Sequence, residues 1–281
     1  MRFAKGHGTE NDFVILVDPE NSRPLAAGLV ARLCDRRAGI GADGVLRAVR
    51  TAALPAAGAA EPAGAAAAEW FMDYRNSDGS LAEMCGNGIR VFARYLIDRG
   101  LATGPSFTVA TRSGLRPVRV EANGDITVDM GPATALGPGR AVLGGRVWEG
   151  LRISVGNPHL ACLVHEPLAG LDLSAPLELD PAAFPEGGNL ELVQLTGHAS
   201  ASMRVRERGS GETRSCGTGT VAAALAAARA GGQDKGSWEV TVPGGRLTVT
   251  LESDTSWLTG PAVLVAEGEL DPAWLAAAAG S

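Results

Sequence analysis

The chain has 281 residues, with 25 Lys and Arg against 31 Asp and Glu, and its formal net charge is −6. This acidic balance lacks the basic excess typical of nucleic-acid-binding proteins, so we expect a small-molecule partner and no nucleic acid. The first residues contain no long apolar run, and no stretch approaches the roughly 18 apolar residues of a membrane span. We therefore expect a cytoplasmic protein with no membrane partner.

Residue types that hold cofactors are sparse in this chain. It has two lysines, Lys5 and Lys235, and neither stands in a segment that resembles a Schiff-base cofactor loop. The four cysteines, at positions 34, 85, 162 and 216, show no CxxC or zinc-finger spacing and are too few for a secreted disulfide framework. We expect free thiols, no metal and no cofactor.

The first half of the chain contains short apolar runs bounded by Gly and Asn-Gly turns. They predict strands over residues 13–17, 69–74, 118–121 and 126–130. The stretch 51–68 is almost pure Ala, Gly and Pro, which favours a mobile surface insertion, and we assign it no function. A polar turn then leads into Cys85-Gly86-Asn87-Gly88 and an apolar run over 91–96 at helical spacing. This pattern predicts a helix opened by a cysteine.

The second half repeats this organisation. Its apolar runs predict strands over residues 151–155, 159–164, 190–194, 202–207, 238–242 and 246–251. A polar turn leads into Cys216-Gly217-Thr218-Gly219, and an Ala-rich helical run over 221–230 ends at Gly231-Gly232. The strands do not alternate regularly with helices, so we expect an α+β protein with antiparallel or mixed sheets. The long repeat predicts one central helix, opened by a cysteine, in each half.

The two cysteine motifs point to acid–base chemistry. Glycines beside Cys85 and Cys216 let a ligand approach the backbone, and the N–H groups of each helix start favour an anion. The same field is expected to lower each thiol pKa from about 8.5 toward neutrality. Inversion at a carbon needs a base on one face and an acid on the other, and the two roles exchange for the opposite enantiomer. Cys34 and Cys162 lack this context, so we expect them to be small core residues.

Two other interpretations stay open at this point. A lone cysteine before a helix is more often structural than catalytic, and it is the duplication that favours catalysis. Alternatively, two reactive thiols facing each other could form a redox-sensing dithiol in a binding protein. A thiol titration separates the two functions, because oxidation would give a signal in a sensor and would only inactivate an epimerase.

Six segments, taken in order, resemble the diaminopimelate epimerases over nearly the whole chain. They are residues 5–13, 36–44, 76–80, 85–90, 155–159 and 207–219. The resemblance implies an isomerase that works without a cofactor and interconverts LL- and meso-2,6-diaminopimelate in lysine and peptidoglycan biosynthesis. It also implies that Cys85 and Cys216 serve as thiolate base and thiol acid.

The resemblance further implies a set of substrate contacts. They are the side chains of Asn11, Asn76, Asn157, Asn189, Glu207 and Arg208 and the backbone N–H groups of Gly86, Asn87, Gly217 and Thr218. Amide oxygens and a carboxylate suit the ammonium groups of a zwitterion, and the Arg208 guanidinium can hold a carboxylate through two bonds. His159 and Glu207 are implied to modulate the pKa of the thiols.

The sequence departs from the family pattern at two positions. Some relatives carry Gln after the Gly-x-Asp of the second segment to touch substrate, and this chain has Gly44 there. Glu10 adds a charge to the opening segment, which raises a question about the conformation of that loop.

The family fold implies two pseudo-symmetric domains, each a curved sheet around a central helix, with the active site in the cleft between them. The domains are expected at 1–130, completed by about 262–281, and at 131–261. The family is often dimeric, so a homodimer is a further expectation. Proline or hydroxyproline racemases and an isomerase of phenazine synthesis belong to the same structural superfamily, and the motifs at Asn157 and Glu207-Arg208 argue against both.

Overall fold

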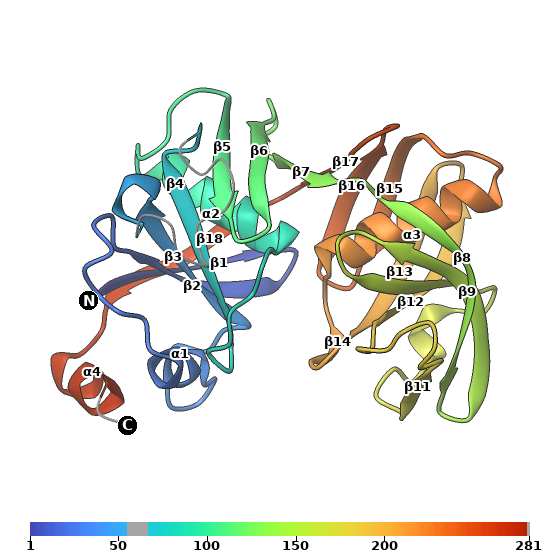
Figure 1. Cartoon of the computed structure of the whole chain (residues 1–281), viewed down its shortest axis with the longest axis horizontal. Helices are drawn as coiled ribbons and strands as arrows, with labels where there is room; N and C mark the ends of the chain where they lie inside the picture. Colours follow the sequence, from blue (N-terminus) through green and yellow to red (C-terminus); the bar gives the residue numbers. More distant parts are fainter. Residues whose placement is uncertain (55–66, 280–281) are drawn as a thin grey trace. The chain divides into compact units, whose positions relative to one another are not determined.

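The computed structural model describes residues 1–54 and 67–279 (Figure 1). The chain forms two compact units: the first contains Met1–Val128 and the segment that begins at Pro261, and the second contains Asp129–Gly260. Most of the stretch 51–68, for which the sequence predicts an insertion, lies outside the described residues. Its described start is a short 3-10 turn over Thr51–Ala53.

The first unit is built on a mixed sheet. Its strands are β1 (Arg2–Gly8), β2 (Asn11–Val17), β3 (Gly44–Arg50), β4 (Trp70–Asn76), β5 (Ser106–Thr111), β6 (Gly114–Val120), β7 (Ile126–Gly131) and β18 (Val263–Glu269). They pair in the order β18-β1-β2-β3-β4-β5-β6-β7, where β2–β3 and β4–β5 are parallel and the other pairs are antiparallel. The last strand of the chain therefore returns to the first unit.

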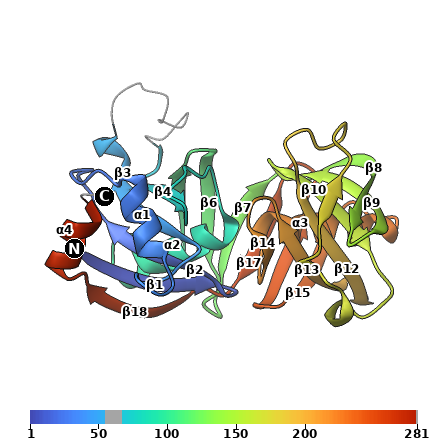
Figure 2. The same cartoon turned by 90° about the horizontal axis from the view of Figure 1, so that it is seen from below.

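Helices cover both faces of this sheet. Helix α2 (Gly86–Asp98) contacts β1, β2, β3, β4 and β18. Helices α1 (Ala27–Cys34) and α4 (Pro272–Ala279) pack against each other in a second layer (Figure 2). Alternate β2 side chains face the two layers: Phe13 lies near Gly88 of α2, whereas Val14 packs with Leu29 and Leu33 of α1. A strand covered on both faces is apolar throughout, which explains the continuous run at residues 13–16.

The second unit has the same plan. Its main strands are β8 (Thr134–Leu143), β9 (Arg146–Ser154), β10 (Pro158–Leu163), β12 (Asn189–Gly197), β13 (Ser200–Glu207), β15 (Gly236–Val242), β16 (Gly245–Leu251) and β17 (Ser256–Gly260). Two short strands, β11 (Leu177–Leu179) and β14 (Gly211–Thr213), pair with β8 and β13.

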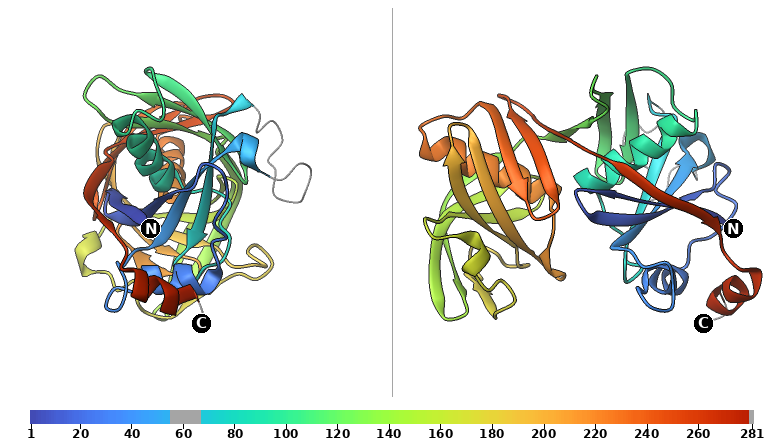
Figure 3. Two further views of the ribbon diagram at one scale, coloured as in Figure 1. Left: turned by 90° about the vertical axis from the view of Figure 1, so that its left-hand side faces the viewer. Right: turned by 180° about the vertical axis from the view of Figure 1, so that it is seen from behind.

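The duplication extends to the strand pairing. In the order β8-β9-β10-β12-β13-β15-β16-β17, the pairs β10–β12 and β13–β15 are parallel and the remaining pairs for which a register is resolved are antiparallel. Across the sheet, parallel and antiparallel strand pairs therefore occur in the same order as in the first unit. Helix α3 (Gly217–Ala230) connects β13 to β15, the second parallel pair of its unit, as α2 connects β4 to β5 in the first unit, and each helix packs on its own strands (Figure 3). The predicted α+β class with two pseudo-symmetric halves is confirmed.

The apolar core of the second unit fixes which side chains of β12 face the helix. Leu190 and Leu192 pack in a buried cluster with Leu160, Cys162 and Trp148. The intervening residues of β12 therefore point to the opposite face, toward α3. Cys34 and Cys162 are buried in the two cores, as predicted, and all four cysteines are free thiols. Among the described helices, none has the length and apolar character needed to cross a membrane.

Candidate active site

Each central helix begins at a cysteine. Cys85 and Cys216 are the N-cap residues of α2 and α3, and both have extended backbone angles. The Cys85 sulfur accepts a hydrogen bond from Gly88 N–H at 3.3 Å, and the Cys216 sulfur accepts one from Gly219 N–H at 3.4 Å. Sulfur thus occupies the place that a Ser or Asp oxygen usually takes at an N-cap. Both thiols therefore lie in the positive field of a helix N-terminus.

In the first unit, three of the predicted site residues lie together. Asn11 Oδ1 lies 3.6 Å from the Cys85 sulfur and accepts a hydrogen bond from Asn87 Nδ2 at 3.2 Å. The Asn11 amide donates to Asp43 Oδ2 at 2.7 Å, and Arg36 in turn donates to Asp43 at 2.8 Å. Asp43, which sequence reasoning did not select, therefore fixes which end of the Asn11 amide faces the thiol.

The turn before Asn11 settles the question raised by Glu10. Thr9 and Glu10 have φ angles of 49° and 62°, so the β1–β2 hairpin closes on two left-handed residues. Such a turn matches the twist of the paired strands. Glu10 is exposed, while Thr9 is buried and its hydroxyl accepts a hydrogen bond from Arg90 at 3.3 Å. Glu10 therefore lies at the exposed tip of this hairpin.

Close packing explains why residue 44 is a glycine. A Cβ at this position would lie 2.5 Å from the Arg75 carbonyl oxygen and 2.8 Å from Tyr74 Cε2. The β3–β4 pairing therefore leaves no room for the glutamine that some relatives are expected to carry here.

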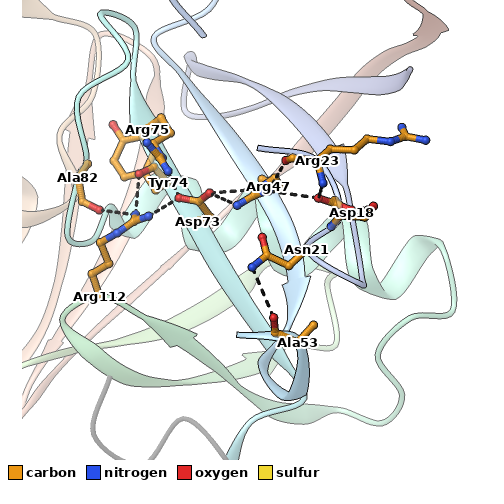
Figure 4. Close-up of polar contacts among 11 residues, drawn as sticks. Asp18, Asn21, Arg23, Arg47, Ala53, Asp73, Tyr74, Arg75, Ala82 and Arg112 are labelled. Atoms are coloured by element: carbon orange, nitrogen blue, oxygen red, sulfur yellow. Dashed lines mark hydrogen bonds and ion pairs between the residues drawn. The ribbon is translucent and has the colours of Figure 1, made fainter. Parts of the chain in front are cut away.

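A buried ion-pair network holds the segment that leads to Cys85 (Figure 4). Asp73, which is 1% exposed, pairs with Arg47 at 2.8 Å, with Arg75 at 2.9 Å and with Arg112. Arg112 also donates to the carbonyl oxygens of Tyr74 at 2.9 Å and of Ala82 at 3.2 Å. The guanidinium thereby joins the end of β4 to the segment just before Cys85. Burial raises the pKa of Asp73, but hydrogen bonds from Arg75 and Arg112 outweigh it and hold that pKa below its usual value.

Asn76 follows this network at the end of β4. Its side-chain amide donates to the Ser80 hydroxyl at 3.0 Å. Its predicted role as a substrate contact stays a prediction.

In the second unit, a chain of polar side chains leads to Cys216. His159 Nδ1 lies 2.6 Å from Glu191 Oε1, and His159 Nε2 lies 2.9 Å from Asn157 Oδ1. The Asn157 amide donates to the Thr218 hydroxyl at 3.3 Å, and that oxygen is 3.5 Å from the Cys216 sulfur. The fold thus brings together three predicted site residues, His159, Asn157 and Thr218. It adds Glu191, which was not predicted, as the partner of His159.

Glu207 lies beside Cys216 and accepts a hydrogen bond from the Thr213 hydroxyl. Burial raises the pKa of the Glu207 carboxyl above its usual value. Burial, followed by the charges of Glu207 and Glu191, raises the pKa of the Cys216 thiol well above its usual value. The predicted lowering of the thiol pKa is therefore wrong for Cys216, because burial and two carboxyl groups outweigh the helix field.

Asn189 and Arg208 are linked through the backbone. Asn189 Oδ1 accepts from the Arg208 backbone N–H at 2.9 Å, and the Asn189 amide donates to the Pro158 carbonyl at 3.3 Å. The Arg208 side chain is 47% exposed and donates to the Glu186 carbonyl at 3.2 Å. Arg208 and Glu207 line a cavity of about 490 Å³ together with Phe184. Asn189 thus braces the segment that carries Arg208.

Glu191 is the main residue that sequence reasoning missed. An acid within the apolar run Leu190-Glu191-Leu192 was the available signal. Over residues 1–54 and 67–279, no group of three His, Cys, Asp or Glu side chains is arranged to hold a metal ion.

The comparisons with known proteins agree on one family. The family described as "Diaminopimelate epimerase" matches residues 3–136 and 151–265. A diaminopimelate epimerase of Thermobifida fusca is 60% identical over 270 residues, covering 96% of this chain and 98% of that protein. One of Mycolicibacterium smegmatis is 53% identical over 291 residues and covers both chains completely.

Solved structures share the fold at low identity. A hydroxyproline epimerase of Agrobacterium vitis, with bound trans-4-hydroxy-L-proline, has a TM-score of 0.68 at 15% identity and covers 98% of this chain and 93% of that chain. A phenazine biosynthesis protein of Bacillus anthracis has a TM-score of 0.66 at 17% identity and covers 96% and 98%. These likenesses concern the fold alone.

Proposed function

Because this chain belongs to the diaminopimelate epimerase family and is an isomerase, we propose that it interconverts LL- and meso-2,6-diaminopimelate by a two-cysteine mechanism in lysine and peptidoglycan biosynthesis. One observation carries the mechanism: Cys85 and Cys216 are the N-caps of equivalent helices in two units with the same strand pairing. Stereoinversion requires such a pair, with one group for each face of the carbon.

The proton transfers follow from the two thiols. The thiolate of one cysteine takes the α-hydrogen as a proton, so its S–H bond forms while the C–H bond breaks and the electron pair stays on carbon. The thiol of the other cysteine then gives its proton to the opposite face and becomes the thiolate. The negative charge delocalises into the substrate carboxylate, which the N–H groups of a helix start are suited to bind.

The surroundings of the thiols support different resting roles. Burial and the carboxyl groups of Glu207 and Glu191 hold Cys216 as the neutral thiol. Cys216 is therefore the proton donor of the first turnover in this proposal, and Cys85 is the base. The roles are exchanged for the opposite enantiomer, because each turnover leaves the proton on the other sulfur.

The remaining side chains suit a zwitterionic substrate with two amino-acid ends. Arg208 presents an exposed guanidinium at the cavity that Glu207 also lines, and a guanidinium can hold a carboxylate through two parallel bonds. Glu207 and the amide oxygens of Asn11 and Asn157 are acceptors for an ammonium group. We propose Asn76, Asn189 and the N–H groups of Gly86, Asn87, Gly217 and Thr218 as further substrate contacts.

The test is epimerisation in deuterated water. LL substrate should give meso product that carries deuterium at the inverted carbon, while the remaining LL substrate stays largely protiated at early times. The reason is that one sulfur removes the hydrogen and the other delivers one derived from solvent. Free L-proline, offered in the same assay, should not racemise.

Alanine variants locate the two groups. Cys85→Ala and Cys216→Ala should each lose epimerisation by roughly 10²- to 10⁴-fold or more, the usual contribution of one acid or base. Cys34→Ala is the matched control, because Cys34 is a buried core thiol at the end of α1, and its folded fraction should keep the wild-type rate. Product that retains the original hydrogen, or an active Cys85→Ala or Cys216→Ala enzyme, would overturn the mechanism.

A further inference from the structure

Glu191 is a fully buried acid that the chemistry above does not use directly. Its side chain is 0% exposed, and β12 places it on the face toward α3, between Leu190 and Leu192. One carboxylate oxygen, Oε1, lies 2.6 Å from His159 Nδ1. The other, Oε2, has no hydrogen-bond partner within the described part of the chain. Burying a carboxyl group among apolar side chains is costly, so its presence calls for a functional reason.

Glu191 and Asn157 bind the two ring nitrogens of His159. Because the oxygen at 2.9 Å from His159 Nε2 is the Asn157 carbonyl, an acceptor, Nε2 carries a hydrogen. Nδ1 then either accepts from the Glu191 carboxylic acid or, in the imidazolium form, donates to the carboxylate. Asn157 is then fixed with its NH₂ group toward Thr218, so that the Thr218 hydroxyl accepts from it and keeps its own hydrogen for the Cys216 sulfur.

Glu191 also touches the helix start itself. A Cβ at Gly219 would lie 2.7 Å from Glu191 Oε1, so the carboxyl group packs directly on this residue and would have to move for any larger side chain. Gly219 is the residue whose N–H donates to the Cys216 sulfur at 3.4 Å. Glu191 is therefore connected to the Cys216 thiol in two ways. One is the series of hydrogen-bonded side chains His159, Asn157 and Thr218, and the other is the backbone of α3 at Gly219.

We propose that Glu191 is a positioning residue for Cys216: it fixes His159, Asn157 and Thr218 in the orientation that directs the Thr218 hydroxyl at the sulfur. The inference rests on the proposed function. The ionisable groups that act on the Cys216 sulfur are Glu207 from β13 and Glu191 from β12, and the Thr218 hydroxyl of α3 lies beside it. His159 from β10 acts on both of these carboxyl groups. Although burial raises the pKa of the Glu191 carboxyl itself, its negative charge raises the pKa of the Cys216 thiol by more than the hydrogen bond from Thr218 lowers it.

The first test is thiol alkylation as a function of pH, read separately for each cysteine by mass spectrometry of peptides. Glu191→Gln keeps the size of the side chain and removes its charge, so the midpoint for Cys216 alkylation should move to lower pH. Cys85 is an internal control in the same molecule and should keep its midpoint. Cys34 is a buried thiol whose pKa burial raises to about 11 and on which Glu191 does not act, so it should keep its own alkylation rate in the variant. Glu178→Gln, which removes an exposed acid of the same unit, is the matched variant and should shift neither midpoint.

The second test is kinetic. Glu191→Gln should lower kcat for diaminopimelate by about 10- to 100-fold with little change in KM, which is the usual size of an effect from a displaced catalytic group. Thr218→Val removes the hydroxyl at the other end of the same series of hydrogen-bonded side chains. Because Thr218 is only partly buried, this variant is available if Glu191→Gln folds poorly. If both residues act through one chain, the double variant should be about as slow as the slower single variant.

The outcomes separate this inference from the proposed function. Alkylation does not depend on epimerisation, so a shifted Cys216 midpoint in an enzyme that never epimerises diaminopimelate would support Glu191 and reject the activity. An enzyme that epimerises normally with Glu191→Gln, with an unchanged Cys216 midpoint, would overturn the role of Glu191. Multiplicative effects in the double variant would also contradict it, because they would mean independent sites.

Discussion

The two helix-start thiols have different charged neighbours. Burial and the charges of Glu207 and Glu191 raise the pKa of Cys216, whereas Cys85 interacts with a buried cation, Arg90. Arg90 is 0% exposed; burial lowers its pKa to about 10, and the charge of Cys85 opposes that lowering. A neighbouring guanidinium favours a thiolate, whereas neighbouring carboxylates favour a thiol. This asymmetry is the residue-level reason to assign the first base and the first acid to different cysteines.

Arg208 provides a test of substrate recognition. Arg208→Lys keeps the charge but removes the planar fork that holds a carboxylate through two bonds. We expect KM for diaminopimelate to rise roughly 10- to 100-fold, the range for losing a hydrogen bond to a charged group, with a smaller change in kcat. Steady-state kinetics at saturating and limiting substrate will measure both values. Arg229→Lys, at the exposed end of α3, is the control and should leave KM unchanged; an unchanged KM for Arg208→Lys would remove that residue from the site.

Among the secondary-structure elements, β4 and the segment before α2 depend on the Asp73 network. Asp73→Asn leaves three arginines beside a neutral amide, and breaking a buried pair in this way should lower the free energy of unfolding by about 3–5 kcal/mol near pH 7. Because the pKa of Asp73 is lowered in the folded state, its stabilisation is present above the unfolded value of about 4 and is lost as the pH falls below it. The variant should therefore lose less stability than the wild type on acidification.

Urea denaturation at several pH values checks this prediction. Asp98→Asn is the control, since Asp98 forms an exposed pair with Arg94 at 3.5 Å that contributes little. A free energy of unfolding that is unchanged by Asp73→Asn at neutral pH would contradict the structural role of the network. Activity of the folded fraction should fall as well, because Arg112 would no longer be held against the segment that ends at Cys85.

The elements also show how far the sequence could predict the structure. Both central helices can be predicted from the sequence, because a cysteine, two glycines and an apolar run are all local signals. Strand β1 was not predicted, because its sequence is interrupted by Gly6 and Gly8 and is fixed by pairing with β2 and β18. Glu191 lay inside a predicted strand, but its role depends on the parallel pairing that sets His159 opposite Asn189. That contact joins strands about 30 residues apart, which local patterns do not reveal.

At the scale of the whole molecule, the first unit is completed by the end of the chain. Strand β18 pairs with β1 over Arg2–His7, and Leu270 packs in the cluster that contains Val14 and Leu33. The Pro261 carbonyl accepts a hydrogen bond from Arg90, the buried residue that also holds the Thr9 turn before Asn11. The segment from Pro261 onward therefore supports the Cys85 side of the proposed site from far away in the sequence.

Truncation after Gly260 is the corresponding test. Removing β18 would expose the edge of β1 and leave Arg90 without one of its acceptors, so we expect the first unit to lose its cooperative unfolding transition. The second unit keeps all its strands and α3, so amide hydrogen exchange should still protect residues of β12 and β13 while protection in β1 and β2 is lost. Epimerisation should be abolished, because the mechanism needs both thiols, yet alkylation of Cys216 should keep its wild-type pH dependence. Removing only the residues after Glu269 is the milder control, since it deletes α4 and leaves every strand pair intact. If the protein truncated after Gly260 kept its activity, or if β12 lost protection together with β1, the two units would not be the separate folding bodies that their contacts indicate.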